Sequence, residues 1–126
     1  MPYTNIKPKE AYQRIQEGFR YLDVRTVEEF QAGHAKGAVN IPIILKTPAG
    51  REQNPNFLTV VQEKFPKGTK LVIGCHSGGR SAIACQVLET QGYPEVYNII
   101  GGFGGGVDSE TGESIKGWKD EGLPVE

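Results

Sequence analysis

Short apolar runs alternate with segments of helical periodicity along this chain, a pattern typical of a parallel sheet covered by helices. The clearest run is residues 71–74, Leu-Val-Ile-Gly, which is continuously apolar and partly β-branched and predicts a buried strand. The other predicted strands are short and are bounded by turn residues or helix starts; they are residues 3–6, 21–24, 38–41 and 96–100. The pattern therefore predicts an α/β sandwich.

The predicted helices begin and end at residues that suit helix termini. Pro8 suits a first helical turn, and Gly18 would end the helix that follows it. Thr26 and Glu29 form the Thr-x-x-Glu capping box of a short second helix. In all, we predict helices over residues 8–17, 26–33, 55–65, 81–91 and 114–121, and a loop over 45–55.

Composition limits the classes of protein that the chain can represent. Its 126 residues are the commonest size for one domain, so we expect residues 1–126 to form a single domain. No apolar run approaches the ~20 residues of a membrane span, and no membrane partner is expected. A net charge of −1 without a basic block argues against nucleic-acid binding. Residues 1–5 carry neither a basic leader nor an apolar stretch, so a cytoplasmic location is expected.

The two cysteines, Cys75 and Cys85, are too few for a disulfide framework and lack the further ligands of a zinc site. No metal or cofactor is therefore expected. Cys75 directly follows the predicted buried strand and precedes a Gly-rich turn and a helix, where α/β proteins place ligand sites. A helix N-terminus and a nearby cation, here Arg80, lower the pKa of a free thiol from about 8.5. Cys75 is therefore the candidate nucleophile.

The turn that follows Cys75 is suited to holding a negative charge. Its sequence is His76-Ser77-Gly78-Gly79-Arg80. The glycines allow successive backbone N–H groups to turn inward into an anion-binding nest, which suits one charged sulfur or a small oxyanion. The alternative is an inert core cysteine beside glycines that only shape a turn. The Gly-Gly-Arg-Ser run and the helix start behind it favour the functional interpretation.

Three parts of the chain together resemble the rhodaneses in their single-domain form. They are residues 23–30 (DVRTVEEF) with 33–42 (GHAKGAVNIP), residues 75–81 (CHSGGRS), and the carboxyl end formed by Gly101-Gly102-Phe103, Trp118 and residues 122–125 (GLPV). The first resembles the amino-side signature of the family and the second its active-site loop. The resemblance covers nearly the whole chain, and the combination is specific.

The resemblance implies a rhodanese-like three-layer sandwich, with a mainly parallel five-stranded sheet and helices on both faces. It also implies a thiosulfate sulfurtransferase. Cys75 would attack the outer sulfur of a small anionic donor such as thiosulfate, and sulfite would leave. A thiol or cyanide acceptor, or a protein that accepts sulfur, would then take the sulfur from the Cys75 persulfide. The amides of residues 76–80 would hold the persulfide, while Arg80 would either attract the donor or point toward a helix neighbour.

Two departures from the family pattern stand out. Residues 104–113 lengthen the usual spacing before Trp118 and are interpreted as an insertion, whose path the sequence does not predict. His76 stands where the family often has a basic or other polar residue, so it either tunes the charge of the site or is solvated. Trp118 itself is expected to be a packing anchor, and His34 to satisfy backbone groups at a helix end.

Other candidates lie outside the loop. Asp23 and Arg25 could support the loop, but a salt bridge that ties a strand to a helix is the favoured interpretation. Ser81, the residue after the predicted turn, is a further supporting candidate. Cys85 is expected to be a structural cysteine on the following helix. The glycines of residues 101–106 lack the strand-to-helix context of a dinucleotide-binding motif, which excludes that function.

Two rival functions remain at this point. A phosphatase or arsenate reductase also holds anions with a cysteine-arginine loop, and some of these enzymes share this fold. Those enzymes resemble Cys-x₅-Arg, whereas here four residues separate Cys75 from Arg80, a ring that suits one sulfur better than a tetrahedral oxyanion. A carrier module that passes sulfur between protein partners would have the same sequence features, and the sequence leaves it open.

Overall fold

Five parallel strands form the central sheet of the computed structural model, which describes residues 3–108 and 110–126. In spatial order they are β1 (Thr4–Ile6), β7 (Val96–Ile99), β6 (Leu71–Gly74), β2 (Arg20–Asp23) and β3 (Val39–Asn40). The apolar strand β6 is central, and Ile73 pairs with Leu22 on one side and Asn98 on the other. The predicted strands are thereby confirmed to within one residue at each end.

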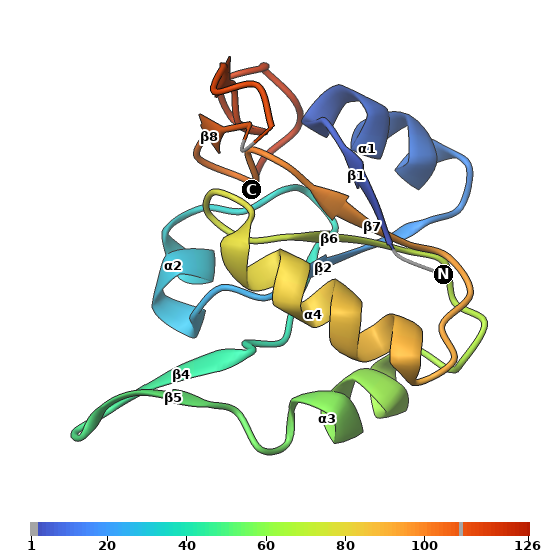
Figure 1. Cartoon of the computed structure of the whole chain (residues 1–126), viewed down its shortest axis with the longest axis vertical. Coiled ribbons are helices and arrows are strands. Elements are labelled where there is room, and N and C mark those ends of the chain that lie inside the picture. The colour runs from blue at the N-terminus through green and yellow to red at the C-terminus, as the bar shows by residue number, and fades with distance from the viewer. Residues whose placement is uncertain (1–2, 109) are drawn as a thin grey trace.

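The side chains of β6 alternate between two cores because successive residues of a strand point to opposite faces. Ile73 belongs to the core under α3 (Phe57–Lys64) and α4 (Gly79–Thr90), whereas Val72 belongs to the core that contains Ala11 of α1 (Pro8–Gln16). Figure 1 shows α4 and α1 on opposite sides of the sheet. The predicted α/β architecture, with helices on both faces, is confirmed.

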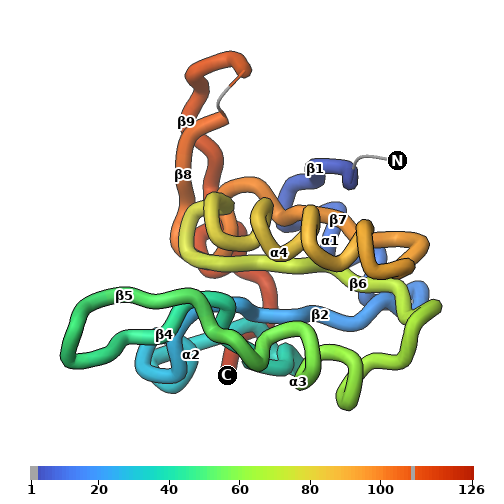
Figure 2. Tube along the Cα trace, turned by 60° about the horizontal axis from the view of Figure 1, so that its bottom comes forward, coloured from blue at the N-terminus to red at the C-terminus, as the bar shows by residue number. Residues whose placement is uncertain are grey.

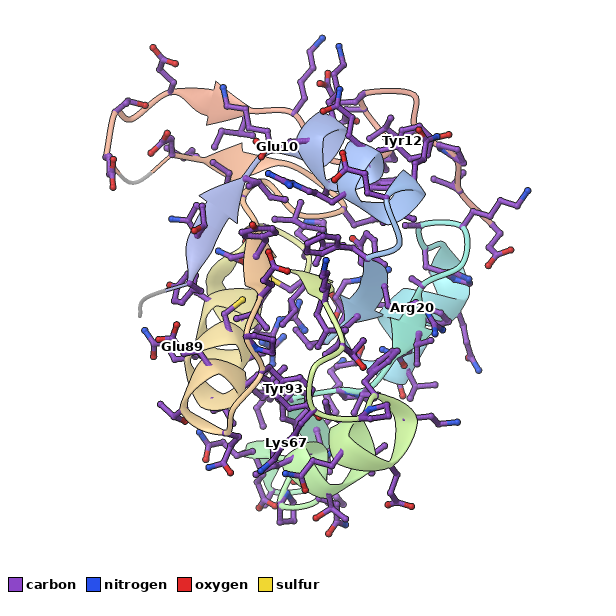
Figure 3. The ribbon with its side chains drawn as sticks, turned by 90° about the vertical axis from the view of Figure 1, so that its right-hand side faces the viewer. Glu10, Tyr12, Arg20, Lys67, Glu89 and Tyr93 are labelled. Atoms are coloured by element: carbon purple, nitrogen blue, oxygen red, sulfur yellow. The ribbon has the colours of Figure 1, made fainter. Side chains whose placement is uncertain are left out.

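Side-chain hydrogen bonds fix the start of one helix and the end of another. The predicted capping box at the start of α2 (Val27–Ala32) is present: Glu29 N donates to Thr26 Oγ1, and Thr26 N donates to Glu29 Oε1. Tyr93, which follows α4, is labelled in Figure 3. Its hydroxyl donates to the backbone oxygen of Phe65 at 2.6 Å and ties this part of the chain to the end of α3.

The predicted helix over residues 114–121 is wrong. Ser114–Ile115 is a strand, β9, which pairs antiparallel with β8 (Gly106–Val107), and turns follow it. The backbone N–H of Trp118 donates to Gly102 O instead of to the carbonyl four residues earlier, and the bulky indole is buried. Backbone hydrogen bonds to the Gly-rich segment therefore replace the hydrogen bonds that a helix would form. Of the predicted insertion, residues 104–108 and 110–113 are described and residue 109 lies outside the described residues. They include β8 and lead into β9 of this hairpin, which projects away from the sheet (Figure 2).

The predicted loop over residues 45–55 is also largely wrong, because it contains a second hairpin (Figure 2). Its strands are β4 (Ile44–Thr47) and β5 (Gly50–Gln53), paired antiparallel. The pairing is between backbone groups, and all four residues of β5 are exposed, so its polar composition resembled that of a loop.

The helix that follows the Gly-rich turn is longer than predicted. It begins at Gly79, two residues before the predicted start, and α4 spans 12 residues. Within the described part of the chain, no helix is both long enough and apolar enough to cross a bilayer.

Candidate active site

The loop between β6 and α4 wraps around the sulfur of Cys75. The strand ends at Gly74, Cys75 follows, and the chain reverses at Gly78, whose φ of +120° strongly favours glycine. This conformation turns the N–H of Gly78 back toward the cysteine, and it donates to Cys75 Sγ at 3.0 Å. The glycine that the sequence assigned to an anion-binding turn thus provides a direct donor to the sulfur.

Cys75 is nearly enclosed, with 2% of its surface exposed, and lies beside the first turn of α4. The second polar group on its sulfur is the hydroxyl of Ser81, 3.4 Å from Sγ. The other neighbours belong to the apolar core under α3 and α4. A backbone N–H donor and a helix N-terminus thus meet at one sulfur, a setting that favours negative charge on it.

A Gly-rich segment supports the loop from the other side. Phe103 N donates to Cys75 O at 2.8 Å, and Gly104 N donates to His76 O at 2.9 Å. Gly102 lies so close that an added Cβ would collide with the carbonyl oxygens of Cys75 and His76. The sequence showed this glycine run but not its function, which is to let one backbone approach another.

The side chains of the predicted loop point in different directions. His76, Ser77 and Gly79 are exposed, and the His76 ring lies against Gly104. Of the predicted loop residues, Gly78 is the one that hydrogen-bonds to Cys75 Sγ in the described structure.

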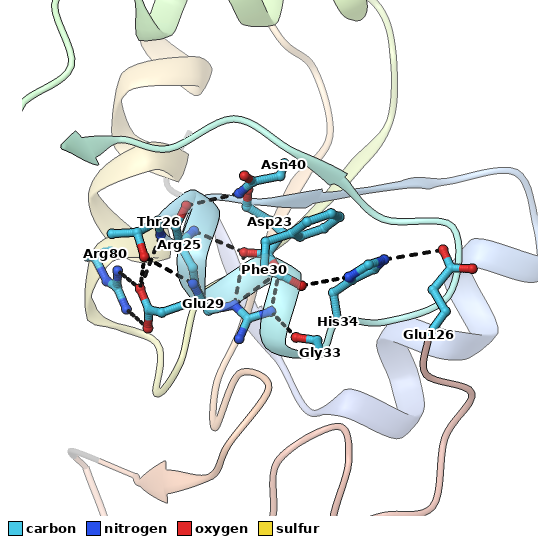
Figure 4. A network of polar contacts seen from close by, with 10 residues as sticks. All are labelled: Asp23, Arg25, Thr26, Glu29, Phe30, Gly33, His34, Asn40, Arg80 and Glu126. Atoms are coloured by element: carbon cyan, nitrogen blue, oxygen red, sulfur yellow. Dashed lines mark hydrogen bonds and ion pairs between the residues drawn. The ribbon is translucent and has the colours of Figure 1, made fainter. Parts of the chain in front are cut away.

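The Arg80 side chain points to a neighbouring helix, one of the two directions considered from the sequence. Its Nη1 and Nη2 donate to the two carboxylate oxygens of Glu29 on α2, at 2.7 and 3.0 Å (Figure 4). This hydrogen-bonded pair lowers the pKa of Glu29 to about 2 and raises the pKa of Arg80. The bidentate ion pair ties the start of α4 to α2.

The Glu29–Arg80 pair predicts a pH-dependent stability. At neutral pH, Glu29→Gln is expected to lower the free energy of unfolding by about 1–2 kcal/mol, a value discounted because the Glu29 side chain is one-third exposed and screened. The folded-state pKa lies below the unfolded value of about 4.3, so this stability is present above that value and is lost as the pH falls toward 2.

Urea unfolding of both proteins between pH 7 and pH 3 checks this prediction, with the exposed neighbour Glu28→Gln as the matched control. The difference between the natural protein and Glu29→Gln should narrow below about pH 4.3. A difference that stays constant over this range, or an equal loss in Glu28→Gln, contradicts the assignment.

Asp23 and Arg25 form a buried ion pair beside the loop rather than contacts to Cys75. Arg25 Nη2 lies 2.8 Å from Asp23 Oδ2 and also donates to the backbone oxygen of Gly33 at the end of α2 (Figure 4). The guanidinium lies over the ring of Phe103, whose N–H holds the Cys75 carbonyl. This geometry agrees with the favoured interpretation, a salt bridge that links a strand to a helix. The pair also contacts the loop indirectly, through Phe103.

His34, Cys85 and Trp118 occupy the positions expected of structural residues. His34 Nδ1 lies 2.8 Å from Phe30 O at the end of α2, and its Nε2 faces Glu126 (Figure 4). Cys85 is fully buried, and burial raises the pKa of its thiol. Trp118 is 1% exposed and donates from Nε1 to the backbone oxygen of Pro124.

One polar residue near the sulfur was missed by the sequence analysis. Asn98 is 3% exposed on β7, and its Oδ1 accepts a hydrogen bond from Ser81. It lies 17 residues after Ser81 in the chain, on another element. The one available signal was a polar residue inside an apolar strand, because a buried amide needs a partner.

Comparisons with known proteins show the family that the chain resembles. A family model described as "Rhodanese-like domain" matches residues 7–108. "Thiosulfate sulfurtransferase 16, chloroplastic" of Arabidopsis thaliana is 38% identical over 97% of this chain and 92% of its own length. "Thiosulfate sulfurtransferase 18" of the same plant is 41% identical over 83% of this chain and 79% of its own length.

Two further relatives are longer than this chain, and a solved structure has a similar fold. The chain spans 61% of the length of two other plant relatives, each 36% identical to it. The solved structure "Crystal structure of Rv0390 from M. tuberculosis" matches all of this chain and 98% of its own, with 27% identity and a TM-score of 0.81. The location expected from the N-terminus stays a prediction. The matched family model and the relatives show that this chain belongs to the rhodanese family.

Proposed function

We propose that this protein is a sulfurtransferase that moves the outer sulfur of thiosulfate, or of a similar anionic donor, to a thiophilic acceptor through Cys75. The observation that carries the proposal is the Gly78 N–H, which points at Cys75 Sγ at 3.0 Å, where it stabilises a negatively charged sulfur. The printed names of two relatives, which are thiosulfate sulfurtransferases, support the same activity.

The reaction balances as two displacements at sulfur. In the first, the Cys75 thiolate attacks the outer sulfur of thiosulfate, the S–S bond of the donor breaks, and sulfite leaves with the electron pair. The enzyme then carries a persulfide whose terminal sulfur bears the negative charge. In the second, cyanide or a thiolate attacks that terminal sulfur, the persulfide bond breaks, and the Cys75 thiolate is restored.

The Arg80–Glu29 pair argues against the phosphatase and arsenate reductase alternatives. In a loop that holds a tetrahedral oxyanion, an arginine supplies a bidentate pair of donors to that oxyanion. Here both terminal nitrogens of Arg80 donate to Glu29. The loop is left with backbone donors, which suit one charged sulfur.

Mass spectrometry on donor-treated protein tests the proposal. Brief exposure to thiosulfate should add the mass of one sulfur atom to Cys75, and cyanide should remove it with release of thiocyanate. Cys85→Ala, which removes the buried second thiol, should take up sulfur in the same way. No added sulfur on Cys75, or faster consumption of a phosphate ester or arsenate than of thiosulfate, rejects the assignment. Uptake without discharge to cyanide would point to the carrier alternative.

A further inference from the structure

The hydroxyl of Ser81 lies within hydrogen-bond reach of three acceptors but carries one proton. Its Oγ is 3.4 Å from Cys75 Sγ, 3.1 Å from Gly78 O and 2.5 Å from Asn98 Oδ1. A hydroxyl donates one hydrogen bond at a time. The acceptor that takes this proton therefore decides whether the sulfur of Cys75 receives a hydrogen bond from Ser81.

The contacts of the Asn98 amide determine which of its atoms faces Ser81. Its Nδ2 donates to Asn5 Oδ1 at 3.0 Å and faces the backbone oxygen of Gly78 at 3.5 Å. A backbone carbonyl can only accept, so reversing the amide would bring two oxygens face to face. Asn98 Oδ1 is therefore held toward Ser81. Because Asn98 is 3% exposed, water does not readily replace these bonds.

We propose that Asn98 is a positioning residue, which limits how readily Cys75 ionises by holding the proton of the Ser81 hydroxyl. While Asn98 accepts that proton, Ser81 presents lone pairs to Cys75, an arrangement that suits a protonated thiol. A thiolate needs a donor instead, so ionisation requires the Ser81 proton to leave Asn98 and turn to the sulfur. The lost Ser81–Asn98 bond opposes ionisation. This inference rests on the proposed role of Cys75 as the nucleophile.

The titratable and charged side chains around Cys75 do not hydrogen-bond to Asn98 in the described structure. They are Tyr21, Asp23 and Arg25 on or after β2, Glu29 on α2, His76 on the loop, and Arg80 and Cys85 on α4. Two ion pairs, Asp23–Arg25 and Glu29–Arg80, join four of them. The hydrogen bonds of Asn98 go to Ser81, Asn5 and Gly78. A neutral substitution at Asn98 therefore reaches Cys75 through Ser81 or through Gly78, and the Ser81→Ala background distinguishes these two routes.

The rate of Cys75 alkylation as a function of pH tests the inference. The natural protein and Asn98→Leu are treated with iodoacetamide, and the modified Cys75 peptide is quantified by mass spectrometry. Leucine is close to asparagine in shape but has no acceptor, which frees the Ser81 proton for the thiolate. We expect the pH of half-maximal alkylation to fall by about 0.5–1 unit. An unchanged or higher midpoint in the folded variant overturns the proposal.

A double-mutant cycle separates action through Ser81 from a direct effect on Cys75. Ser81→Ala and the double variant Ser81→Ala/Asn98→Leu should have the same alkylation midpoint, because the hydroxyl through which Asn98 acts is absent. If Asn98→Leu lowers the midpoint equally in the Ser81→Ala background, Asn98 acts on Cys75 directly or through Gly78, and the proposal is wrong.

Asn98→Asp decides the question if the leucine variant does not fold. It keeps the shape of the residue and provides a stronger acceptor for Ser81, so the midpoint should rise, and rise more with Ser81 present than with Ser81→Ala. An equal rise in both backgrounds overturns the proposal. Alkylation requires no sulfur donor, so these results are independent of whether thiosulfate loads Cys75, and failure of the proposed function is seen separately.

Discussion

Replacing Cys75 by serine is expected to lower the rate of thiocyanate formation from thiosulfate and cyanide at least about 1,000-fold. A serine hydroxyl is not ionised near neutral pH, and its oxygen is a weaker nucleophile toward sulfur than a thiolate. The Gly78 N–H and the α4 N-terminus, which favour a charged sulfur, cannot compensate for this difference. Thiocyanate is measured colorimetrically as its iron(III) complex.

Cys85→Ala is the matched control for the serine substitution. Cys85 lies on the same helix but is fully buried, and burial raises the pKa of its thiol, so it should not react. The rate per folded molecule should stay near that of the natural protein. Full activity in Cys75→Ser, or loss of activity in folded Cys85→Ala, contradicts the assignment of the nucleophile.

Gly102→Ala is expected to lower the free energy of unfolding by about 3 kcal/mol or more, and to abolish transfer activity in the protein that still folds. Its φ is +50°, and the added Cβ would collide with Cys75 O and lie 2.7 Å from His76 O. These are backbone atoms of the loop, so relief requires the Gly-rich segment and the loop to separate. That movement would break the bonds from Phe103 and Gly104 that hold the loop.

Gly122→Ala separates the effect of close approach from that of backbone conformation. Gly122 has a φ of +74°, but an added Cβ there would meet no atom within 4 Å. Its cost should be about 1 kcal/mol, that of placing alanine in the left-handed region, and activity should be unchanged. Urea denaturation and the thiocyanate assay on both variants check the contrast. Equal destabilisation by the two substitutions would show that crowding at Gly102 is not the cause.

Local sequence was sufficient where one element carries its own signal. The apolar run over residues 71–74 predicted β6, and the Thr26–Glu29 capping box predicted the start of α2. Local sequence was not sufficient where backbone hydrogen bonds to distant segments replace the bonds within an element. Residues 114–121 were predicted to be a helix, but their backbone forms hydrogen bonds with the Gly-rich segment and with β8. In β5 the backbone pairing of exposed polar residues left no hydrophobic pattern to detect.

The sequence by itself determined the α/β class, the family resemblance and Cys75 as the candidate nucleophile, because a thiol between a buried strand and a Gly-rich helix start is a contiguous signal. Only the tertiary structure decided where Arg80 points, why Gly102 must be glycine, and that Asn98 hydrogen-bonds to the hydroxyl next to the sulfur. Each of these depends on a contact between residues far apart in the chain. Such contacts form when the strands and helices pack, and no local pattern records them.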